Sequence, residues 1–438
     1  MTSYWCEQAL LPDGIRAGVL VEIADGRFAS VTPDSAFGAG MERLDGLVIP
    51  GLANCHSHAF HRALRGRTQT ERGTFWTWRE QMYAVASRLT PESYYELARG
   101  VYGEMALAGI TCVGEFHYLH HAPGGVPYDE PNAMGEALIE AARSVGLRIA
   151  LLDTCYVAGG IDQPLNPVQQ RFSDGTADAW AARVSGLKGA DDVMIGAAAH
   201  SIRGVPQDQL STVAHLLPEA PLHIHLSEQV AENEACAAAY GRTPTQLLDE
   251  TGFLTGRTSA VHATHLTKVD IGLLGGSGSY ACFCPTTERD LADGIGPSVA
   301  LREAGSPLTL GSDSHAVIDL FEEMRAVELD ERLATQERGH WSAPELLAAA
   351  TVDGHRSLGF PDAGRIQPGA RADLVAVRLD SVRTAGGGAT PETAVFAATA
   401  ADVTTVIASG HPIVTASRHT TLDVPTTLTT TITALTNP

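Results

Sequence analysis

The chain has 438 residues, a formal net charge of −21 and a sequence pI near 5.1. Such an acidic protein lacks the basic surface that binding to nucleic acid or to an anionic membrane requires. The sequence contains no run of about 18 apolar residues, the length of a membrane span, and its first residues lack the pattern of a secretion signal. With seven cysteines and no CxxC pair, we expect a cytoplasmic protein.

Short strand-like segments occur at both ends of the chain, at 18–23, 28–31, 44–49, 372–377 and 403–410. Neither end carries enough of them to close a core alone. We therefore expect residues 1–49 and 361–438 to form one small β-sandwich. Within the second stretch, the Thr-rich tail from Thr415 to Pro438 is typical of an extended segment or a frayed terminus.

Between residues 50 and 360, apolar strand-like runs alternate with longer amphipathic segments, as in βα units around a parallel sheet. The eight runs are 48–54, 110–116, 148–156, 193–200, 222–226, 260–265, 280–284 and 308–312. Helical spacing of apolar residues appears at 91–108, 133–145, 207–217 and 319–333. The fold class is therefore α/β, with a TIM-like (β/α)8 barrel whose reactive groups lie where the strands end.

Polar residues at these strand ends have the pattern of a metal site. His56 and His58 are separated by one residue, so their side chains point the same way along a strand. His223 and His225 share a face of the fifth run, and His225, nearer its end, is the better third ligand. Asp313 emerges from the eighth run, where a buried unpaired carboxylate would be unfavourable. Three histidines and one aspartate suit one divalent ion, Zn2+ first and Fe2+ second, with an open position for water.

A bound divalent ion lowers the pKa of its water to about 7, which makes hydroxide available at neutral pH. Glu228, just beyond the fifth run, is placed to carry the proton of this water to a departing nitrogen. His262 can orient or deprotonate the water, and Asp313 can accept a hydrogen bond from it. The expected product is ammonia or an amine. On its own segment, Glu228 is equally well explained as a solvated loop residue.

The histidine pair at the first strand, the histidines at the fifth and sixth, the aspartate at the eighth and the β segments at both ends resemble the amidohydrolase superfamily. Members with two metals have a bridging lysine at the end of the fourth strand. Here His200 stands at that place, and the two lysines, Lys188 and Lys268, lie elsewhere. The chain is therefore similar to the mononuclear deaminases. Their nucleobase-specific members usually carry Pro-x-Ser-Asn at the seventh strand, whereas this chain has Cys-Pro-Thr-Thr-Glu at 284–288, which argues against a nucleobase substrate.

The segments 75–80, 115–118, 199–204 and 225–229 further resemble the formimidoylglutamate deiminase family. The resemblance implies hydrolysis of N-formimidoyl-L-glutamate to N-formyl-L-glutamate and ammonia, a step of histidine degradation, with metal-held hydroxide attacking the formimidoyl carbon. It also implies a homodimer.

The same resemblance assigns substrate contacts. Arg79 and Arg203 would each hold one carboxylate of the dicarboxylate substrate, because the arginine fork matches a carboxylate. Tyr118 and His200 would add hydrogen bonds. His61 stands where some members have glutamine and can still donate a hydrogen bond; a supporting or surface histidine is the alternative.

Two other hypotheses stay open. The first is a related deaminase or hydrolase acting on a nucleobase, nucleoside, pterin or s-triazine. The second is a non-catalytic relative that keeps the barrel for binding. Arg79 and Arg203 discriminate the first from the leading interpretation, because the other substrates have no carboxylates for these residues to hold.

Overall fold

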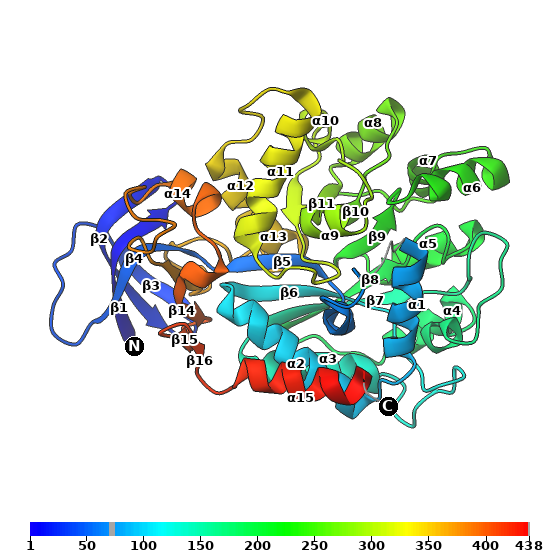
Figure 1. The fold of residues 1–438 in the computed structure, drawn as a ribbon, viewed down its shortest axis with the longest axis horizontal. Helices are drawn as coiled ribbons and strands as arrows, with labels where there is room; N and C mark the ends of the chain where they lie inside the picture. The colour runs from blue at the N-terminus through cyan, green and yellow to red at the C-terminus, as the bar shows by residue number, and fades with distance from the viewer. Residues whose placement is uncertain (70–74, 437–438) are drawn as a thin grey trace.

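The computed structural model describes residues 1–69 and 75–436, and within these ranges the strands form two eight-stranded sheets. The barrel strands are β5 (Leu52–Ser57), β6 (Ile110–His117), β7 (Arg148–Cys155), β8 (Val193–Ala199), β9 (Leu222–Leu226), β10 (Thr258–His262), β11 (Tyr280–Phe283) and β12 (Leu308–Leu310). The terminal sheet contains β1 (Thr2–Leu11), β2 (Gly14–Ala24), β3 (Arg27–Thr32), β4 (Glu42–Pro50), β13 (Leu374–Val377), β14 (Val403–Ala408), β15 (His411–Thr415) and β16 (Arg418–His419). Figure 1 shows the terminal sheet on the left and the barrel on the right.

The predicted (β/α)8 barrel is confirmed. Strands β5 to β12 pair in parallel and in sequence order. Their side chains are almost all buried, as expected when a parallel sheet is covered on its outer face and filled inside. At the seam between the last and first strands, Asp313 N–H donates to His56 C=O at 3.0 Å, and His58 N–H donates to Asp313 C=O at 3.2 Å. The closure of the barrel therefore brings the first and eighth strands' polar residues together.

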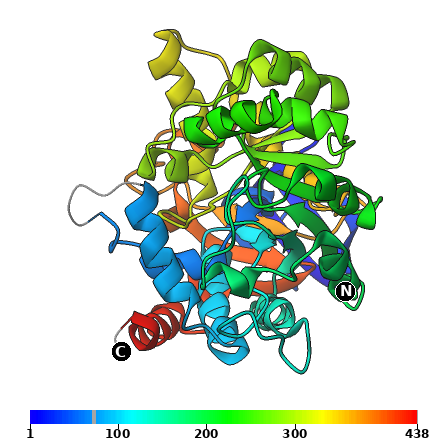
Figure 2. The ribbon, with the colours of Figure 1, turned by 90° about the vertical axis from the view of Figure 1, so that its right-hand side faces the viewer.

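Helices cover the barrel, as Figure 2 shows from the side opposite the terminal sheet. They are α1 (Phe75–Ala86), α2 (Pro91–Leu107), α3 (Ala133–Val145), α4 (Ala177–Val184), α5 (Gln207–Leu216), α6 (Val230–Tyr240), α7 (Pro244–Glu250), α8 (Lys268–Ser277), α9 (Pro285–Asp290), α10 (Ser298–Ala304), α11 (Leu320–Thr335), α12 (Ala343–Ala350), α13 (Val352–Ser357), α14 (Pro391–Phe396) and α15 (Val424–Thr436). Short 3-10 helices are η1 (Ala59–Leu64), η2 (Gln169–Phe172) and η3 (Ala400–Asp402). The four helices predicted from apolar spacing correspond to α2, α3, α5 and α11.

The terminal domain is built from both ends of the chain, as expected. Its strands join in one mixed sheet, in which N-terminal β4 pairs antiparallel with C-terminal β13, for example Val48 with Ala376. The sheet has a hydrophobic core of its own, which includes Tyr4, Phe28 and Ile407. The division at residues 49 and 361 stays a prediction.

Most of the C-terminal tail is helical, so the extended or frayed end predicted from its threonines is wrong for residues 424–436, although β16 (Arg418–His419) near its start is extended. Helix α15 packs on the barrel helix α2, and Figure 1 shows the two lying side by side below the barrel. Two glycines of α2 make the close approach possible. A Cβ on Gly100 would lie 2.9 Å from Leu428 Cδ2, and one on Gly103 would lie 2.8 Å from Val424 Cγ2. Tertiary packing of these apolar residues overrides the low helix propensity of threonine.

A buried ion pair joins the barrel to the terminal sheet. Arg148, the first residue of β7, donates from Nη1 to Asp373 Oδ1 at 3.0 Å, and its Nη2 contacts Oδ2. Both side chains are almost completely buried. Burial raises the pKa of Asp373, but the charge of Arg148 and its hydrogen bonds lower the pKa by more, so the pKa of Asp373 lies below its usual range. Asp373 Oδ1 also accepts from Ser409 N–H at 2.8 Å, which ties in β14.

The seven cysteines are all buried, and none is paired with another. None of the helices in the described part of the chain combines the length and apolar character that crossing a membrane needs.

Candidate active site

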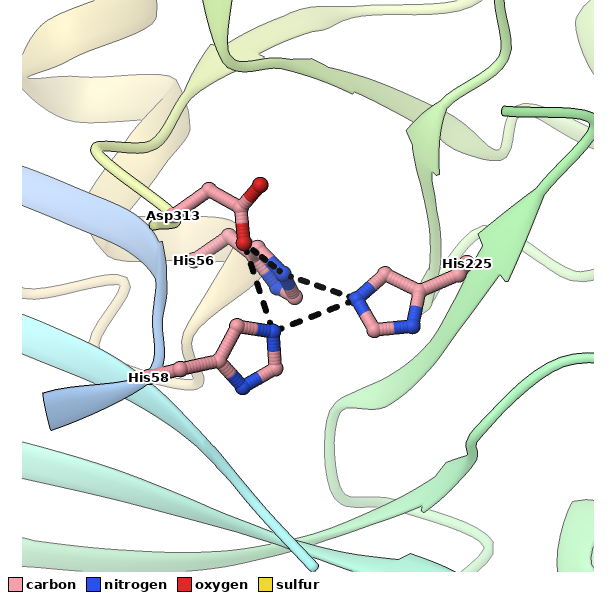
Figure 3. Close-up of side chains that lie close together, drawn as sticks. All are labelled: His56, His58, His225 and Asp313. Carbon is pink, nitrogen blue, oxygen red and sulfur yellow. Dashed lines mark hydrogen bonds and ion pairs between the residues drawn. The ribbon is translucent and has the colours of Figure 1, made fainter. Parts of the chain in front are cut away.

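Four side chains converge at the C-terminal end of the barrel (Figure 3). His56 belongs to β5, His58 follows it, His225 lies in β9 and Asp313 follows β12. The Nε2 atom of His225 is 3.0 Å from His56 Nε2 and 3.3 Å from His58 Nε2. Asp313 Oδ1 lies 3.3 Å from Nε2 of both His56 and His58. These are the four residues that the sequence predicts as metal ligands.

The geometry fits a divalent cation. Ligand atoms about 2.0–2.1 Å from a tetrahedral zinc lie about 3.3 Å from one another. The four distances that join His56 and His58 to His225 and Asp313 are 3.0 to 3.3 Å, and all the ligand atoms lie within 4.8 Å of one another. In two of the histidines, the ring nitrogen that faces away from the cluster donates a hydrogen bond to a backbone carbonyl. Nδ1–H of His58 donates to Phe116 C=O at 3.0 Å, and Nδ1–H of His225 donates to His200 C=O at 2.9 Å. Each hydrogen bond fixes the tautomer that leaves Nε2 as an acceptor facing the cluster.

The electrostatics keep the ligands in the required protonation states. Burial lowers the pKa of His56 and His225, and it lowers the pKa of His58 to about 3, so these rings stay neutral. Burial raises the pKa of Asp313, but the hydrogen bond with His56 and the charge of His262 outweigh this effect, and the pKa lies well below its usual range. Neutral imidazoles and an ionised carboxylate are the forms that bind metals.

Glu115 lies behind the histidine pair in β6. Its Oε1 accepts from Ala59 N–H at 2.7 Å, and its Oε2 accepts from Ser57 Oγ at 2.6 Å. Both donors flank the segment that carries His58. Burial raises the pKa of Glu115 to about 7, against the lowering effect of these hydrogen bonds. Glu115 therefore fixes the turn that aims the first two ligands.

The two predicted proton carriers lie beside the cluster. Nε2 of His262, the last residue of β10, is 3.7 Å from Asp313 Oδ2. Burial lowers the pKa of His262, but the hydrogen bond to Glu288 and the charges of Glu228 and Asp313 raise it well above its usual value. Burial raises the pKa of Glu228. A histidine that holds its proton is suited to orient a water rather than to deprotonate it, and a carboxyl with a raised pKa is suited to carry a proton.

The backbone at this site occupies an uncommon conformation. His262 has φ = 69° and Asp313 has φ = 41°, both in the left-handed region. Such residues persist where the surrounding structure holds them, and they concentrate at functional sites. The strain turns both side chains from the ends of their strands toward the cluster.

Glu288 in α9 is a site residue that sequence analysis missed. Its Oε1 lies 3.2 Å from Nδ1 of His262 and accepts from Cys284 N–H at 2.9 Å. The carboxylate therefore holds the ring of His262 from the side opposite Asp313. Glu288 is the last residue of the segment 284–288 that the sequence analysis named. Its role could not be predicted, because its contact with His262 depends on how α9 packs against β10.

A cavity next to the cluster brings the predicted substrate contacts together. Its lining includes His61, Arg79, Tyr118, His200 and Arg203, together with Glu228 and His262. The rest of the wall is mainly aromatic and was not predicted; it includes Trp78, Met82, Tyr83, Tyr156, Phe172 and Leu291. Of the 75–80 segment, the structure describes side chains from Thr77 onward.

The two arginines reach the cavity from different elements. Arg79 lies on α1, where its guanidinium is 5.7 Å from the ring centroid of Tyr83. Arg203 lies in the turn after β8. Burial lowers the pKa of His200, and the charges of both arginines lower it further, so both cations act on this ring of the cavity wall.

His61 and Tyr118 form a pair on the cavity wall. His61 Nε2 lies 3.0 Å from the Tyr118 hydroxyl, and both side chains are buried. His61 is therefore not a surface residue. Its role as a substrate contact stays a prediction, as do the roles of the other lining residues.

A barrel of this topology, with three histidines and an aspartate at its mouth, defines a hydrolase of the amidohydrolase type. The model of the amidohydrolase family matches residues 47–413, and the model described as the N-terminal domain of formimidoylglutamate deiminase HutF matches residues 1–45. The formimidoylglutamate deiminase of Pseudomonas aeruginosa is 36% identical over 96% of each chain, and the 8-oxoguanine deaminase of the same organism is 31% identical over 78% of this chain and 76% of its own.

Solved structures agree with this assignment. An amidohydrolase from Brucella melitensis superposes with a TM-score of 0.93 at 33% identity, covering 99% of this chain and 100% of its own. An adenosine deaminase from Xanthomonas campestris, 24% identical over 98% and 96% of the two chains, has the same fold with a TM-score of 0.86. The chain belongs to the amidohydrolase family and, within it, to the formimidoylglutamate deiminases.

Proposed function

We propose that this protein hydrolyses N-formimidoyl-L-glutamate to N-formyl-L-glutamate and ammonia, as the name of its Pseudomonas relative states for that enzyme. The observation that carries the proposal is the cavity, which is lined by two arginines and by three of the four cluster residues, His58, His225 and Asp313. A substrate with two carboxylates at one end and an amidine at the other matches both features.

Arg79 and Arg203 bind the carboxylates of this substrate. Each guanidinium presents several donors in a planar fork, and the aromatic wall excludes water that would compete for them. Tyr118 and His200 stand beside the arginines and donate to the same carboxylates. The formimidoyl group then points toward Glu228, His262 and Asp313.

Once bound at the cluster, a divalent cation makes a water molecule nucleophilic at neutral pH. Glu228 takes the proton of this water as its oxygen bonds to the formimidoyl carbon, and Glu228 then gives the proton to the terminal nitrogen. The proton left on the added oxygen then passes to the same nitrogen through Glu228, the bond between carbon and that nitrogen breaks as the carbonyl of N-formyl-L-glutamate forms, and ammonia leaves. His262 and Asp313 orient the attacking oxygen, and Glu288 holds His262 in place.

Zinc is the metal that we assign to the site, because three imidazoles and one carboxylate at tetrahedral spacing suit Zn2+ better than Mg2+ or Ca2+. Solved relatives of the same fold are described with zinc. A role in histidine degradation, a cytoplasmic location and a homodimer complete the proposal, together with the absence of nucleic-acid and membrane partners. The buried, unpaired cysteines agree with a reducing compartment.

The direct test is ammonia release from N-formimidoyl-L-glutamate by zinc-loaded protein, with 8-oxoguanine, cytosine, adenosine and an s-triazine as parallel substrates. Turnover of the first substrate alone supports the proposal. Turnover of another substrate alone refutes it and leaves the metal site intact. Arg79→Met and Arg203→Met should each raise KM about 10-fold or more, since a hydrogen bond to a charged group contributes roughly 1.5–3 kcal/mol.

A further inference from the structure

Glu232 is a buried carboxylate that the reaction described above does not use. It lies in the first turn of α6, four residues after Glu228, and its side chain is completely buried. Neither of its oxygens has a hydrogen-bond partner among the described residues. An acidic residue in a first helical turn interacts favourably with the helix dipole, but that benefit is small at the surface and does not explain a fully buried carboxylate.

The nearest cation is Arg203. Arg203 Nε lies 3.7 Å from Glu232 Oε2, and Arg203 Nη2 lies 3.7 Å from Glu228 Oε2. These distances are too long for hydrogen bonds but short enough for strong attraction between buried charges. Within the described part of the chain, Arg203 Nε has no hydrogen-bond partner either.

The backbone of Arg203 is firmly held, in contrast to its guanidinium. Gly204 N–H donates to Ser201 C=O at 3.0 Å, and Gly204 C=O accepts from Val157 N–H at 2.8 Å and from Ala158 N–H at 3.0 Å. The base of the side chain is therefore fixed by the turn, and the direction of its charged end depends on the carboxylates around it.

The two carboxylates differ in their relation to the cavity. Glu228 lines the cavity and changes its charge during the proposed reaction, whereas Glu232 is absent from the lining. Only a group that stays out of the chemistry can hold Arg203 in one direction through the whole cycle. Glu232 faces the Nε edge of the guanidinium, which leaves the Nη edge for a ligand in the cavity.

We propose that Glu232 is a positioning residue that aims Arg203 at a carboxylate of the substrate and thereby contributes to the selectivity for dicarboxylates. This inference rests on the proposed function. Glu232 does not line the cavity and reaches the substrate through Arg203, so its removal should weaken substrate binding and leave the chemical step nearly unchanged.

The test compares Glu232→Ala, Glu232→Gln and Glu234→Gln in the zinc-loaded enzyme, with N-formimidoyl-L-glutamate as substrate. Glu234 is an exposed acidic residue of the same helix and serves as the control. We expect Glu232→Ala to raise KM about tenfold with kcat within about twofold, because it removes a charged partner of Arg203. Gln keeps the size of the side chain but not its charge, so Glu232→Gln should raise KM nearly as much as Glu232→Ala.

A double mutant separates positioning from a structural role. In an Arg203→Met background, Glu232→Ala should have no further effect on KM, since coupled residues are non-additive. Equal effects in both backgrounds, or a loss of kcat with unchanged KM, would overturn the inference. If the alanine variant does not fold, the glutamine variant decides: it must raise KM several-fold in the wild-type background and have no further effect on KM in the Arg203→Met background.

The failure of the inference differs from that of the proposed function. Active wild-type enzyme together with an unaffected Glu232→Ala variant refutes only the role of Glu232. Wild-type enzyme that neither turns over N-formimidoyl-L-glutamate nor binds N-formyl-L-glutamate in a calorimeter refutes both.

Discussion

Glu288 provides a sharp test of the site, because it touches His262 and nothing that reacts. Its Oε1 lies 3.2 Å from His262 Nδ1, and both side chains are buried. A hydrogen bond to a charged group contributes roughly 1.5–3 kcal/mol. Loss of that energy in the transition state lowers the rate about 10- to 150-fold. Glu288→Ala should therefore reduce kcat by this factor, with KM and metal content unchanged.

The Glu288→Gln variant separates two contributions of Glu288 to kcat, the orientation of the His262 ring and the negative charge beside it. One amide oxygen can still accept from His262 and from Cys284 N–H, so the ring orientation is retained and only the negative charge is lost. We expect an intermediate loss of about 3- to 10-fold in kcat, the difference between charged and neutral hydrogen bonds.

The assay is steady-state ammonia release, with zinc measured by atomic absorption on the same samples. Asp290→Asn, an exposed neighbour on α9, is the control and should stay within about twofold of the wild-type rate, as expected for a surface substitution. A Glu288→Ala enzyme that keeps the wild-type kcat would show that His262 needs no support, and the assignment of Glu288 would be wrong.

Three further predictions follow from the same structure. Glu228→Gln should retain zinc and bind N-formimidoyl-L-glutamate but lose about 10²–10⁴ in kcat, the usual contribution of a general acid–base group; a rate near that of the wild type would assign proton transfer to another residue. Asp373→Asn should lower the free energy of unfolding by about 3–5 kcal/mol, because it leaves Arg148 charged and buried without its partner; this is measured by urea denaturation, with the exposed Asp380→Asn as a control that should unfold at the same urea concentration as the wild type. Glu115, whose pKa in the folded state is about 7, holds its proton more tightly folded than unfolded. Its contribution to stability is therefore complete below about pH 4.5 and falls by up to about 3 kcal/mol as the pH rises to 7, so the stability of Glu115→Gln relative to the wild type should increase over this interval.

The sequence was sufficient for the metal cluster because strand order determines where the ends of the strands meet. His56 lies in the first barrel strand, His58 follows it and Asp313 follows the last strand, and closure of the barrel makes these strands neighbours. A pattern of period two within each run then selects the side chains that face inward. The metal cluster could therefore be predicted from the sequence, because each of its residues occupies the same place, the end of a barrel strand, in its own βα unit.

Glu288 and Glu232 could not be predicted in the same way. Each lies in the first turns of a helix, where an acidic residue is common for reasons of helix stability alone. Their importance depends on contacts with other segments, β10 for Glu288 and the turn after β8 for Glu232. Helix α15 is a similar case, because its register is set by two glycines of α2, more than 300 residues earlier in the chain.

The charges in the cavity also argue against the alternative substrates. Arg79 and Arg203 line the cavity together with Glu228 and Asp313, and Arg203 Nη2 lies 3.7 Å from Glu228 Oε2. A dicarboxylate with an amidine end can direct its carboxylates to the arginines and its amidine to Glu228 and Asp313, and the reversed orientation would place like charges together. A neutral nucleobase or triazine would bring no negative charge to the two arginines and would not form the charge-assisted hydrogen bonds that a carboxylate forms with them. Sites built around polar partners discriminate against ligands that lack them by about 10⁴–10⁵, so we expect the arginines to exclude such rings even though related barrels accept them.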